Sequence, residues 1–304
     1  MTELQTHIMG QIFPYERWLP QLETLKARYQ KAEPFPHIML ENLLDPPMAS
    51  NVLSEFPAPK SGTWIHYLHV NEKKLGMTTL SNFGPAIQAV VQELNSPRFV
   101  QFLSDLTGIE GLFPDDSLEG GGLHQSPRGG FLNIHADFTV HPHHRTWRRR
   151  VNLLLYLNQN WPDSYGGHLE LWDKKMKHCV HRIAPLFNRS VIFNTDADSF
   201  HGHPEPLACP PGVTRKSIAL YYFTKEPTPP RIRSTEYRAR PGDGFKAVTI
   251  YLDKMILKFY DRLKRFLGIN DDFASKTLKG IARHSEKHGR AKSIRKIRRS
   301  RPNS

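Results

Sequence analysis

Five short apolar runs between residues 131 and 224 constrain the fold of this chain more than any other feature of its sequence. Each run is four to seven residues long, is rich in β-branched or aromatic side chains, and is bounded by Asn, Asp, Gly or Pro. The runs are Phe131–Ile134, Val151–Leu157, Leu169–Trp172, Ser190–Phe193 and Ser217–Phe223. Many short strands with turn signals between them predict a mainly β sandwich or jelly roll, because a parallel α/β layout would place a helix between strands.

A metal site is predicted where the first run ends, at His135 and Asp137. Alternate residues of a strand point to the same face, so these two side chains can project together into the mouth of a barrel. A histidine from a later strand, His201 or His203, would complete two imidazoles and one carboxylate, the donor set of non-haem iron(II) sites with open positions. The pair alone is weak support, because about one His-x-Asp is expected by chance among 16 histidines, and an ordinary buried or surface histidine is the competing interpretation.

An acidic cofactor is predicted from the start of the last strand, where Arg215 and Ser217 share one face. A guanidinium pairs with a carboxylate through two parallel hydrogen bonds, which suits Arg215 to this task. The order of the motifs strengthens both predictions. His-x-Asp follows a strand, and an apolar strand, a Gly-Gly strand and a further apolar strand come next. A histidine then precedes Arg-x-Ser, which opens an aromatic strand.

This combination resembles the prolyl 4-hydroxylase-like branch of the Fe(II)/2-oxoglutarate dioxygenases over residues 131–224. The matching residues are His135, Asp137, Leu155-Tyr156-Leu157-Asn158, Trp161, Gly166-Gly167-His168-Leu169, His201 and Arg215-Lys216-Ser217. A weaker likeness extends upstream through Pro34-Phe35-Pro36-His37 and Gly120-Gly121-Gly122-Leu123-His124. The resemblance implies a double-stranded β-helix core, also called a jelly-roll or cupin-like core, with flanking α-helices.

The resemblance also implies the residues of the site. The catalytic iron ligands would be His135, Asp137 and His201, and the residues that bind 2-oxoglutarate would be Arg215, Tyr156 and Ser217. His201 is preferred to His203 because family members carry this histidine a few residues before a proline, whereas His203 directly precedes Pro204.

The activity implied by the resemblance is hydroxylation of a C–H bond of a substrate, with decarboxylation of 2-oxoglutarate to succinate. The expected cofactors are Fe(II), 2-oxoglutarate as co-substrate and, as a further candidate, ascorbate. The expected partners are O2, 2-oxoglutarate and a substrate, for which a prolyl residue of a protein is the family-based expectation and a small molecule or glycan is the alternative.

Two other functional classes compete with this interpretation. One is a non-catalytic jelly-roll protein that only binds a metal or ligand, and the other is a polyanion-associated protein that acts through its basic tail. Arg215 and Tyr156 argue against the first, since a mere metal binder has no use for a carboxylate fork.

Composition and length fit one jelly roll with helical additions: 304 residues, 35.0 kDa and a mean hydropathy of -0.52. No run of 18 apolar residues is present, so no transmembrane helix is expected. The first residues lack the basic and then apolar pattern of a secretory signal. Cys179 and Cys209 are expected to be free thiols, and the expected location is cytoplasmic.

Four regions are expected along the chain. Residues 1–115 would form a helical and strand support region, 116–226 the jelly-roll catalytic core, 227–268 a linker and an amphipathic helix, and 269–304 a basic, disordered tail. The supporting elements are predicted as helices over Leu19–Tyr29, Asp45–Glu55, Gly84–Asn95 and Pro97–Thr107 and as strands over His37–Leu40 and Trp64–Val70.

Four shorter segments carry further expectations. Thr139–Arg150 is predicted as a solvated, cationic loop at the pocket rim, with a separate histidine metal tract as the alternative. Leu207–Val213 is predicted as a turn that leaves the strand register intact. His124, after three glycines, is a candidate pocket residue, and a plain surface turn is the alternative. The helix predicted over Ala247–Leu267 would pack on the barrel or lie on an anionic membrane or a partner.

The end of the chain differs in composition from the rest. Eleven Lys or Arg and one Glu give residues 275–304 a net charge of +10 out of the whole chain's +13. Such a segment predicts salt-dependent binding to a polyanion, either nucleic acid, acidic lipid or acidic glycan. A solvated tail without a specific partner is the alternative.

Overall fold

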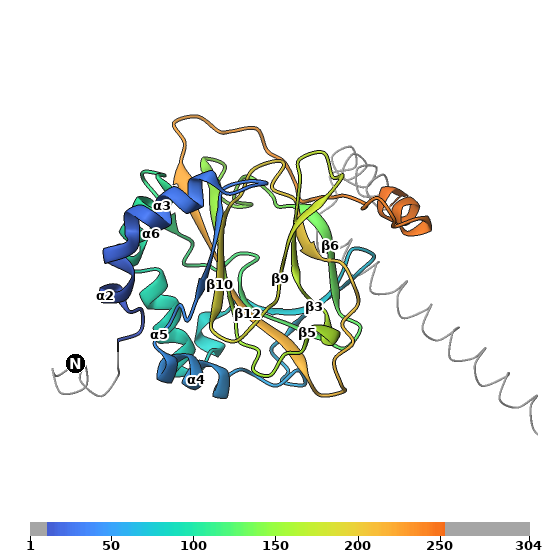
Figure 1. Cartoon of the computed structure of the whole chain (residues 1–304), viewed down its shortest axis with the longest axis horizontal. Helices are drawn as coiled ribbons and strands as arrows, with labels where there is room; N and C mark the ends of the chain where they lie inside the picture. The colour runs from blue at the N-terminus through green and yellow to red at the C-terminus, as the bar shows by residue number, and fades with distance from the viewer. Residues whose placement is uncertain (1–10, 253–304) are drawn as a thin grey trace, which may run out of the picture. The chain divides into compact units, whose positions relative to one another are not determined.

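The structure is a computed structural model that describes residues 11–252, and it is built around one antiparallel sheet of 13 strands (Figure 1). The strands are β1 (His37–Glu41), β2 (Ile65–His69), β3 (Glu72–Met77), β4 (Phe113–Pro114), β5 (Gly122–Pro127), β6 (Phe131–Ala136), β7 (Trp147–Tyr156), β8 (Leu169–Trp172), β9 (Cys179–Ile183), β10 (Arg189–Asn194), β11 (His201–His203), β12 (Thr214–Lys225) and β13 (Glu236–Tyr237). The strand order is β1-β10-β7-β12-β5-β3-β6-β11-β8-β9, with β2 paired to β3, β4 to β12 and β13 to β6.

The predicted mainly β, double-stranded β-helix core with flanking helices is confirmed. All five apolar runs form strands, namely β6, β7, β8, β10 and β12. Strands far apart in the sequence are hydrogen-bonded neighbours, as in the pairs β1–β10 and β5–β12. The sheet curls, so that its inner face encloses a cavity lined from several strands.

The helices gather on one side of the sheet (Figure 1). They are α2 (Tyr15–Trp18), α3 (Leu22–Lys31), α4 (Pro46–Ser54), α5 (Pro85–Leu94) and α6 (Pro97–Thr107), joined by short 3-10 turns at Leu19–Gln21 and Leu80–Asn82. The α6 boundaries follow from local chemistry: Ser96 caps the start by accepting from the Phe99 amide, and Gly108 ends the helix at φ 73°. The four predicted support helices and both predicted support strands are confirmed, each within a few residues.

Alternation along β7 and β12 separates the core from the cavity. Leu153 and Leu155 on β7, with Ile218 and Leu220 on β12, join the core that the helices cover. The residues that alternate with these along each strand turn to the other face. Among them, Tyr156, Ser217 and Arg215 line the cavity. The register of β12 with β5 is unbroken from Thr214 to Ala219, which confirms that the turn over Leu207–Val213 leaves the strand intact.

Two predicted segments differ from the structure. Thr139–Arg150 is not a wholly solvated loop: β7 begins at Trp147, and Arg149 is buried in the cavity wall because an ion pair and two aromatic rings compensate its charge. The linker predicted within residues 227–268 is more than a connection, because β13 within it adds a strand to β6.

The C-terminal predictions are only partly within the described residues. Residues 245–252 are helical, and most of the amphipathic helix predicted over Ala247–Leu267 lies outside the described residues, as does the basic tail at 269–304. Within residues 11–252, no helix combines the length and the apolar character needed to cross a membrane.

Candidate active site

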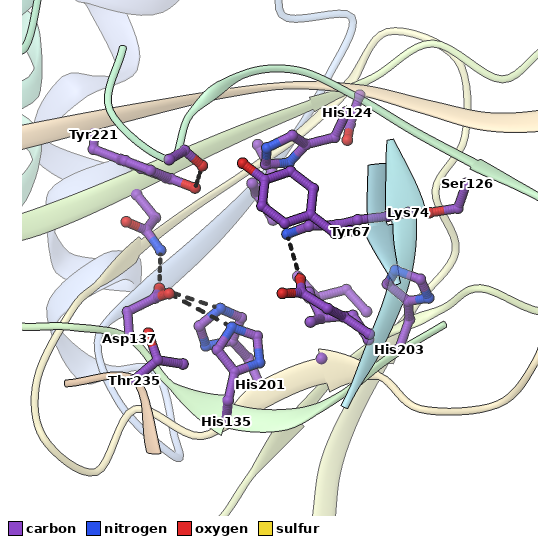
Figure 2. Close-up of a pocket in the computed structure, with 18 of the residues that line it drawn as sticks. Tyr67, Lys74, His124, Ser126, His135, Asp137, His201, His203, Tyr221 and Thr235 are labelled. Atoms are coloured by element: carbon purple, nitrogen blue, oxygen red, sulfur yellow. Dashed lines mark hydrogen bonds and ion pairs between the residues drawn. The ribbon is translucent and has the colours of Figure 1, made fainter. Parts of the chain in front are cut away.

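His135, Asp137 and His201 meet at the inner face of the sheet (Figure 2). His135 lies on β6, Asp137 follows that strand, and β11 pairs with β6 so that His201 lies opposite His135. Asp137 Oδ1 is 3.5 Å from His135 Nε2, and Asp137 Oδ2 is 3.5 Å from His201 Nε2. One ligand atom from each residue lies within 4.8 Å of the others, so the three can share one metal ion.

The two imidazoles present the nitrogens that a metal needs. His135 Nδ1 lies 2.9 Å from the Asn133 carbonyl oxygen, and His201 Nδ1 lies 2.9 Å from the Ser199 carbonyl oxygen. A carbonyl oxygen only accepts, so each Nδ1 donates to it, and Nε2 is the ring nitrogen that faces Asp137 and can bind a metal. Burial, with the neighbouring His135, lowers the pKa of His201 to about 4, which keeps this imidazole neutral. Two imidazoles and a carboxylate fit Fe(II) with open positions.

The carboxylate of Asp137 is held ionised by residues that the sequence reasoning missed. Burial alone would raise the pKa of Asp137, but the Arg149 guanidinium and the two imidazoles outweigh it and hold this pKa well below the usual range. Arg149 Nη2 lies 3.1 Å from Asp137 Oδ2, and Asn152 Nδ2 donates to the same oxygen at 2.7 Å. The three basic residues in a row at 148–150 concealed Arg149, because a basic run normally indicates a solvated surface.

Arg215 lies in the same cavity with its charge uncompensated. It is 6% exposed, its Nε donates to the Gly167 carbonyl at 2.8 Å, and within residues 11–252 it forms no ion pair with a carboxylate. Its guanidinium carbon is 4.8 Å from the centre of the Tyr156 ring. The Tyr156 hydroxyl is buried and has no hydrogen-bond partner among the described residues. Burial raises the pKa of Tyr156, and the Arg215 charge opposes that rise.

Ser217 and Gly167 complete the surroundings of Arg215. Ser217 is buried and lies directly across from Tyr156 in the pairing of β12 with β7. Gly167 has φ +75°, and a Cβ atom there would lie 2.6 Å from Leu207 Cδ2 and 2.9 Å from Arg215 Cδ. The glycine therefore makes room for the Arg215 side chain to reach the cavity. The structure thus brings all six predicted site residues to one cavity.

A family model described as the 2OG-Fe(II) oxygenase superfamily matches residues 121–223. This segment is a 2OG-Fe(II) oxygenase domain. Its chemistry is that of a 2-oxoglutarate-dependent dioxygenase, and the resemblance predicted from the motifs is confirmed. No curated protein matches the sequence.

Solved structures with partial similarity to the oxygenase include three with described ligands or activities. A prolyl hydroxylase from Trichoplax adhaerens, in complex with a hypoxia inducible factor peptide fragment, is 21% identical, with 67% of this chain and 91% of that chain covered and a TM-score of 0.48. A prolyl-4-hydroxylase from Pseudomonas putida is 16% identical, with 66% and 100% covered and a TM-score of 0.47. HygX from Streptomyces hygroscopicus, with nickel, 2-oxoglutarate and hygromycin B bound, is 11% identical, with 76% and 90% covered and a TM-score of 0.41.

His203 and His124 line the cavity of the oxygenase without joining the metal cluster. The pairing of β11 with β6 shifts between His201 and His203, so that His203 lies opposite Leu132. Burial lowers the pKa of both His203 and His124 well below the usual value, and the nearby Arg215 acts in the same direction. His203 Nδ1 has no hydrogen-bond partner among the described residues. The geometry favours His201 as the third ligand, and His124 is confirmed as a pocket residue.

Part of the wall of the oxygenase cavity comes from segments outside the matched span. The cavity measures about 190 Å³. Tyr67, Glu72 and Lys74 reach it from β2 and β3, and Lys74 pairs with Glu72 at 3.1 Å. Thr235, just before β13, and Tyr237, on β13, also reach it. The Tyr237 ring centre lies 5.5 Å from that of His135. No sequence motif marked these residues, because they are assembled by long-range strand pairing.

A separate histidine metal tract at His141, His143 and His144 finds no support. Among residues 11–252, the His, Cys, Asp and Glu groups close enough to share a metal are His135, Asp137 and His201. His141 is buried instead against Asp115, with 3.3 Å between its Nε2 and the carboxylate, and His144 stacks on Trp147 at 3.9 Å between ring centres. These histidines are therefore packing residues of the segment that leads into β7.

Proposed function

We propose that this oxygenase hydroxylates a C–H bond of its substrate with decarboxylation of 2-oxoglutarate to succinate. The observation that carries the proposal is the buried, uncompensated Arg215 guanidinium beside the unpartnered Tyr156 hydroxyl. A buried cation that no carboxylate neutralises and a buried hydroxyl without a hydrogen-bond partner are costly unless a ligand pairs with them. They lie in the same cavity as the His-Asp-His cluster, where a small dicarboxylate would satisfy both groups.

Each residue has a distinct task in this proposal. His135, Asp137 and His201 would hold Fe(II), whose complex with 2-oxoglutarate and O2 supplies the oxidising chemistry. Arg215 would bind the distal carboxylate of 2-oxoglutarate through a charge-assisted fork, and Tyr156 would donate its hydroxyl proton to the same group. Ser217, the cross-strand neighbour of Tyr156, would add a further hydroxyl. The apolar side chains of Leu132, Leu154 and Leu169 in the wall would limit the access of water.

For the substrate we propose a prolyl residue of a protein, and the support is the motif resemblance to prolyl 4-hydroxylase-like enzymes. A screen of proline-containing peptides, small molecules and glycans for a mass gain of one oxygen would test this choice. Oxidation confined to a small molecule or glycan would contradict it. Use of ascorbate, a cytoplasmic location and polyanion binding by the basic tail remain further proposals from sequence alone.

Anaerobic titration with Fe(II) and then 2-oxoglutarate tests the core of the proposal. The expected result is a weak visible charge-transfer band that saturates with 2-oxoglutarate, followed by succinate formation when O2 is admitted. Binding of Fe(II) without a band would contradict the cofactor assignment. A band without succinate, with any substrate in the screen, would favour a non-catalytic metal- and ligand-binding protein.

A further inference from the structure

We propose that Arg149 and Asn152 hold Asp137 as a one-oxygen metal ligand and so keep a coordination position open for 2-oxoglutarate. This inference rests on the proposed function, and it assigns to two positioning residues a role that no motif indicated. The two oxygens of the Asp137 carboxylate are in different surroundings.

Only one of these oxygens is taken up by protein donors. Asp137 Oδ2 accepts from Asn152 Nδ2 at 2.7 Å and lies 3.1 Å from Arg149 Nη2. Within residues 11–252, no amide or guanidinium donor bonds Oδ1, which faces His135 Nε2 at 3.5 Å. A carboxylate can bind a metal through one oxygen or through both. Each oxygen lies 3.5 Å from a ligating nitrogen, Oδ1 from His135 Nε2 and Oδ2 from His201 Nε2. Because Oδ2 is also held by the Asn152 hydrogen bond and the Arg149 ion pair, Oδ1 is the oxygen left to serve as the ligand.

The two donors fix each other. Arg149 Nε donates to Asn152 Oδ1 at 2.8 Å, so the amide of Asn152 must turn its Nδ2 toward Asp137. The three side chains therefore form a closed ring of contacts, in which the orientation of each is set by the other two.

Two aromatic rings hold the guanidinium in place. The Arg149 guanidinium carbon lies 3.4 Å from the centre of the Tyr221 ring and 4.6 Å from that of Phe138. Tyr221 is anchored in turn, because its hydroxyl donates to the Gly120 carbonyl at 2.8 Å. Arg149 is 1% exposed, which leaves it no freedom to swing toward solvent. It is thus fixed as a partner of Asp137.

A bulge in β7 places these residues on one face. Val151 lies opposite Tyr222 of β12, yet Phe223, the next residue of β12, lies opposite Arg149, so that Arg150 is an extra residue on β7. Without this extra residue, Arg149 and Asn152 would point to opposite faces, because strand side chains alternate. Bulges next to active sites commonly redirect a side chain in this way. The bulge is a feature of the backbone and is independent of the contacts around Asp137.

The consequence concerns the number of open positions on the metal. In an octahedral site, two imidazoles and one carboxylate oxygen leave three positions, whereas a carboxylate bound through both oxygens leaves two. Two positions for 2-oxoglutarate and one for O2 require all three. Loss of the ring of contacts would free Oδ2 to compete for one of them.

The test uses the full-length protein loaded with Mn(II), which needs no turnover. Arg149→Met and Asn152→Leu remove one donor each. Arg150→Met is the matched control, because the Arg150 side chain reaches Thr224 Oγ1, at 3.4 Å, and not Asp137. Crystal structures of the Mn(II)-loaded proteins give the number of Asp137 oxygens on the metal, and calorimetry gives the dissociation constant of 2-oxoglutarate.

The parent protein and Arg150→Met are expected to bind Mn(II) through a single Asp137 oxygen. In Arg149→Met and Asn152→Leu, both oxygens are expected on the metal, with the 2-oxoglutarate constant raised about 10- to 100-fold. If Arg149→Met does not fold, Asn152→Leu, which loses only a neutral donor, gives the same two readings. A single-oxygen Asp137 in the folded variants overturns the proposal. Failure of the parent to bind 2-oxoglutarate would instead count against the proposed function, and the same crystals would still report how Asp137 binds.

Discussion

Arg215 lies over the ring of Tyr156, with its guanidinium carbon 4.8 Å from the ring centre, although Tyr156 ends β7 and Arg215 stands near the start of β12. The two strands are hydrogen-bonded neighbours, and Ser217 pairs directly with Tyr156. The contact places a permanent cation and a phenol side by side in the wall of the cavity. Within residues 11–252 no carboxylate pairs with Arg215 and the Tyr156 hydroxyl has no hydrogen-bond partner, so both groups are suited to bind an acidic ligand.

Substitution of Arg215 tests whether its guanidinium binds 2-oxoglutarate. Loss of one partner of a buried charge pair costs about 3–5 kcal/mol, which corresponds to about a hundredfold to a few thousandfold in affinity. Arg215→Ala is therefore expected to raise the 2-oxoglutarate constant by that factor while Mn(II) binding persists. Arg215→Lys should rescue little, because an ammonium cannot form the planar fork, and Tyr156→Phe should cost less than Arg215→Ala. Calorimetry on the Mn(II)-loaded proteins measures all three, and an Arg215→Ala titration equal to that of the parent would contradict the cofactor assignment.

Substitution of His201 and of His203 tests which of the two histidines is the third metal ligand. His201→Ala is expected to abolish the rise in thermal midpoint that Mn(II) causes in the parent, because a ligand that binds only the folded state stabilises it. His203→Ala should keep that rise, since His203 lies outside the metal cluster. Thermal unfolding with and without Mn(II) gives the comparison. The reverse pattern, with the rise lost only in His203→Ala, would show that His203 is the ligand.

The paired glycines before β8 offer a test of packing around Arg215. Gly167→Ala would place a Cβ atom 2.9 Å from Arg215 Cδ and 2.6 Å from Leu207 Cδ2, so the arginine must shift. We expect weaker 2-oxoglutarate binding, by about tenfold or more, with Mn(II) binding retained. Gly166→Ala is the control, because Gly166 has a similar φ of +71° but no atom within 4 Å of its added Cβ. Equal losses in the two variants would mean that backbone strain, and not displacement of Arg215, is responsible.

The basic end of the chain is tested by deletion. Removal of residues 275–304 takes away a net charge of +10 but none of the six proposed site residues. Turnover of 2-oxoglutarate should stay close to that of the parent, while retention on a polyanion such as heparin should weaken and lose its steep salt dependence. Unchanged retention on heparin would contradict the polyanion prediction.

Several site residues at the inner face of the sheet were predictable, because each stands at a fixed place next to an apolar strand in the sequence. His135 and Asp137 follow an apolar strand, and Arg215 opens another, so residue type and spacing were enough to group them. Arg149 was not predictable in the same way. It stands in a basic run that resembles a solvated loop, and only the bulge at Arg150 turns it inward.

The cavity walls were beyond sequence reasoning for a different reason. Tyr67 approaches the site because β2 pairs with β3 and β3 pairs with β6, and Tyr237 approaches it because β13 pairs with β6. These pairings bring distant parts of the chain together. A register between such segments is set by the completed fold, and no short pattern in either segment indicates its partner.

Strand β13 sets a limit on how this protein can be shortened or fused. The family match ends at residue 223, but Thr235 and Tyr237 stand in the cavity wall, and Arg240 fastens the same segment to Glu205 and Asp243. A version of the chain cut at the end of the matched span would keep every proposed metal and 2-oxoglutarate ligand and still lose one side of its substrate chamber. Under the proposed function, such a fragment is expected to bind 2-oxoglutarate but to oxidise its substrate less efficiently per 2-oxoglutarate consumed, because one wall of the cavity is missing.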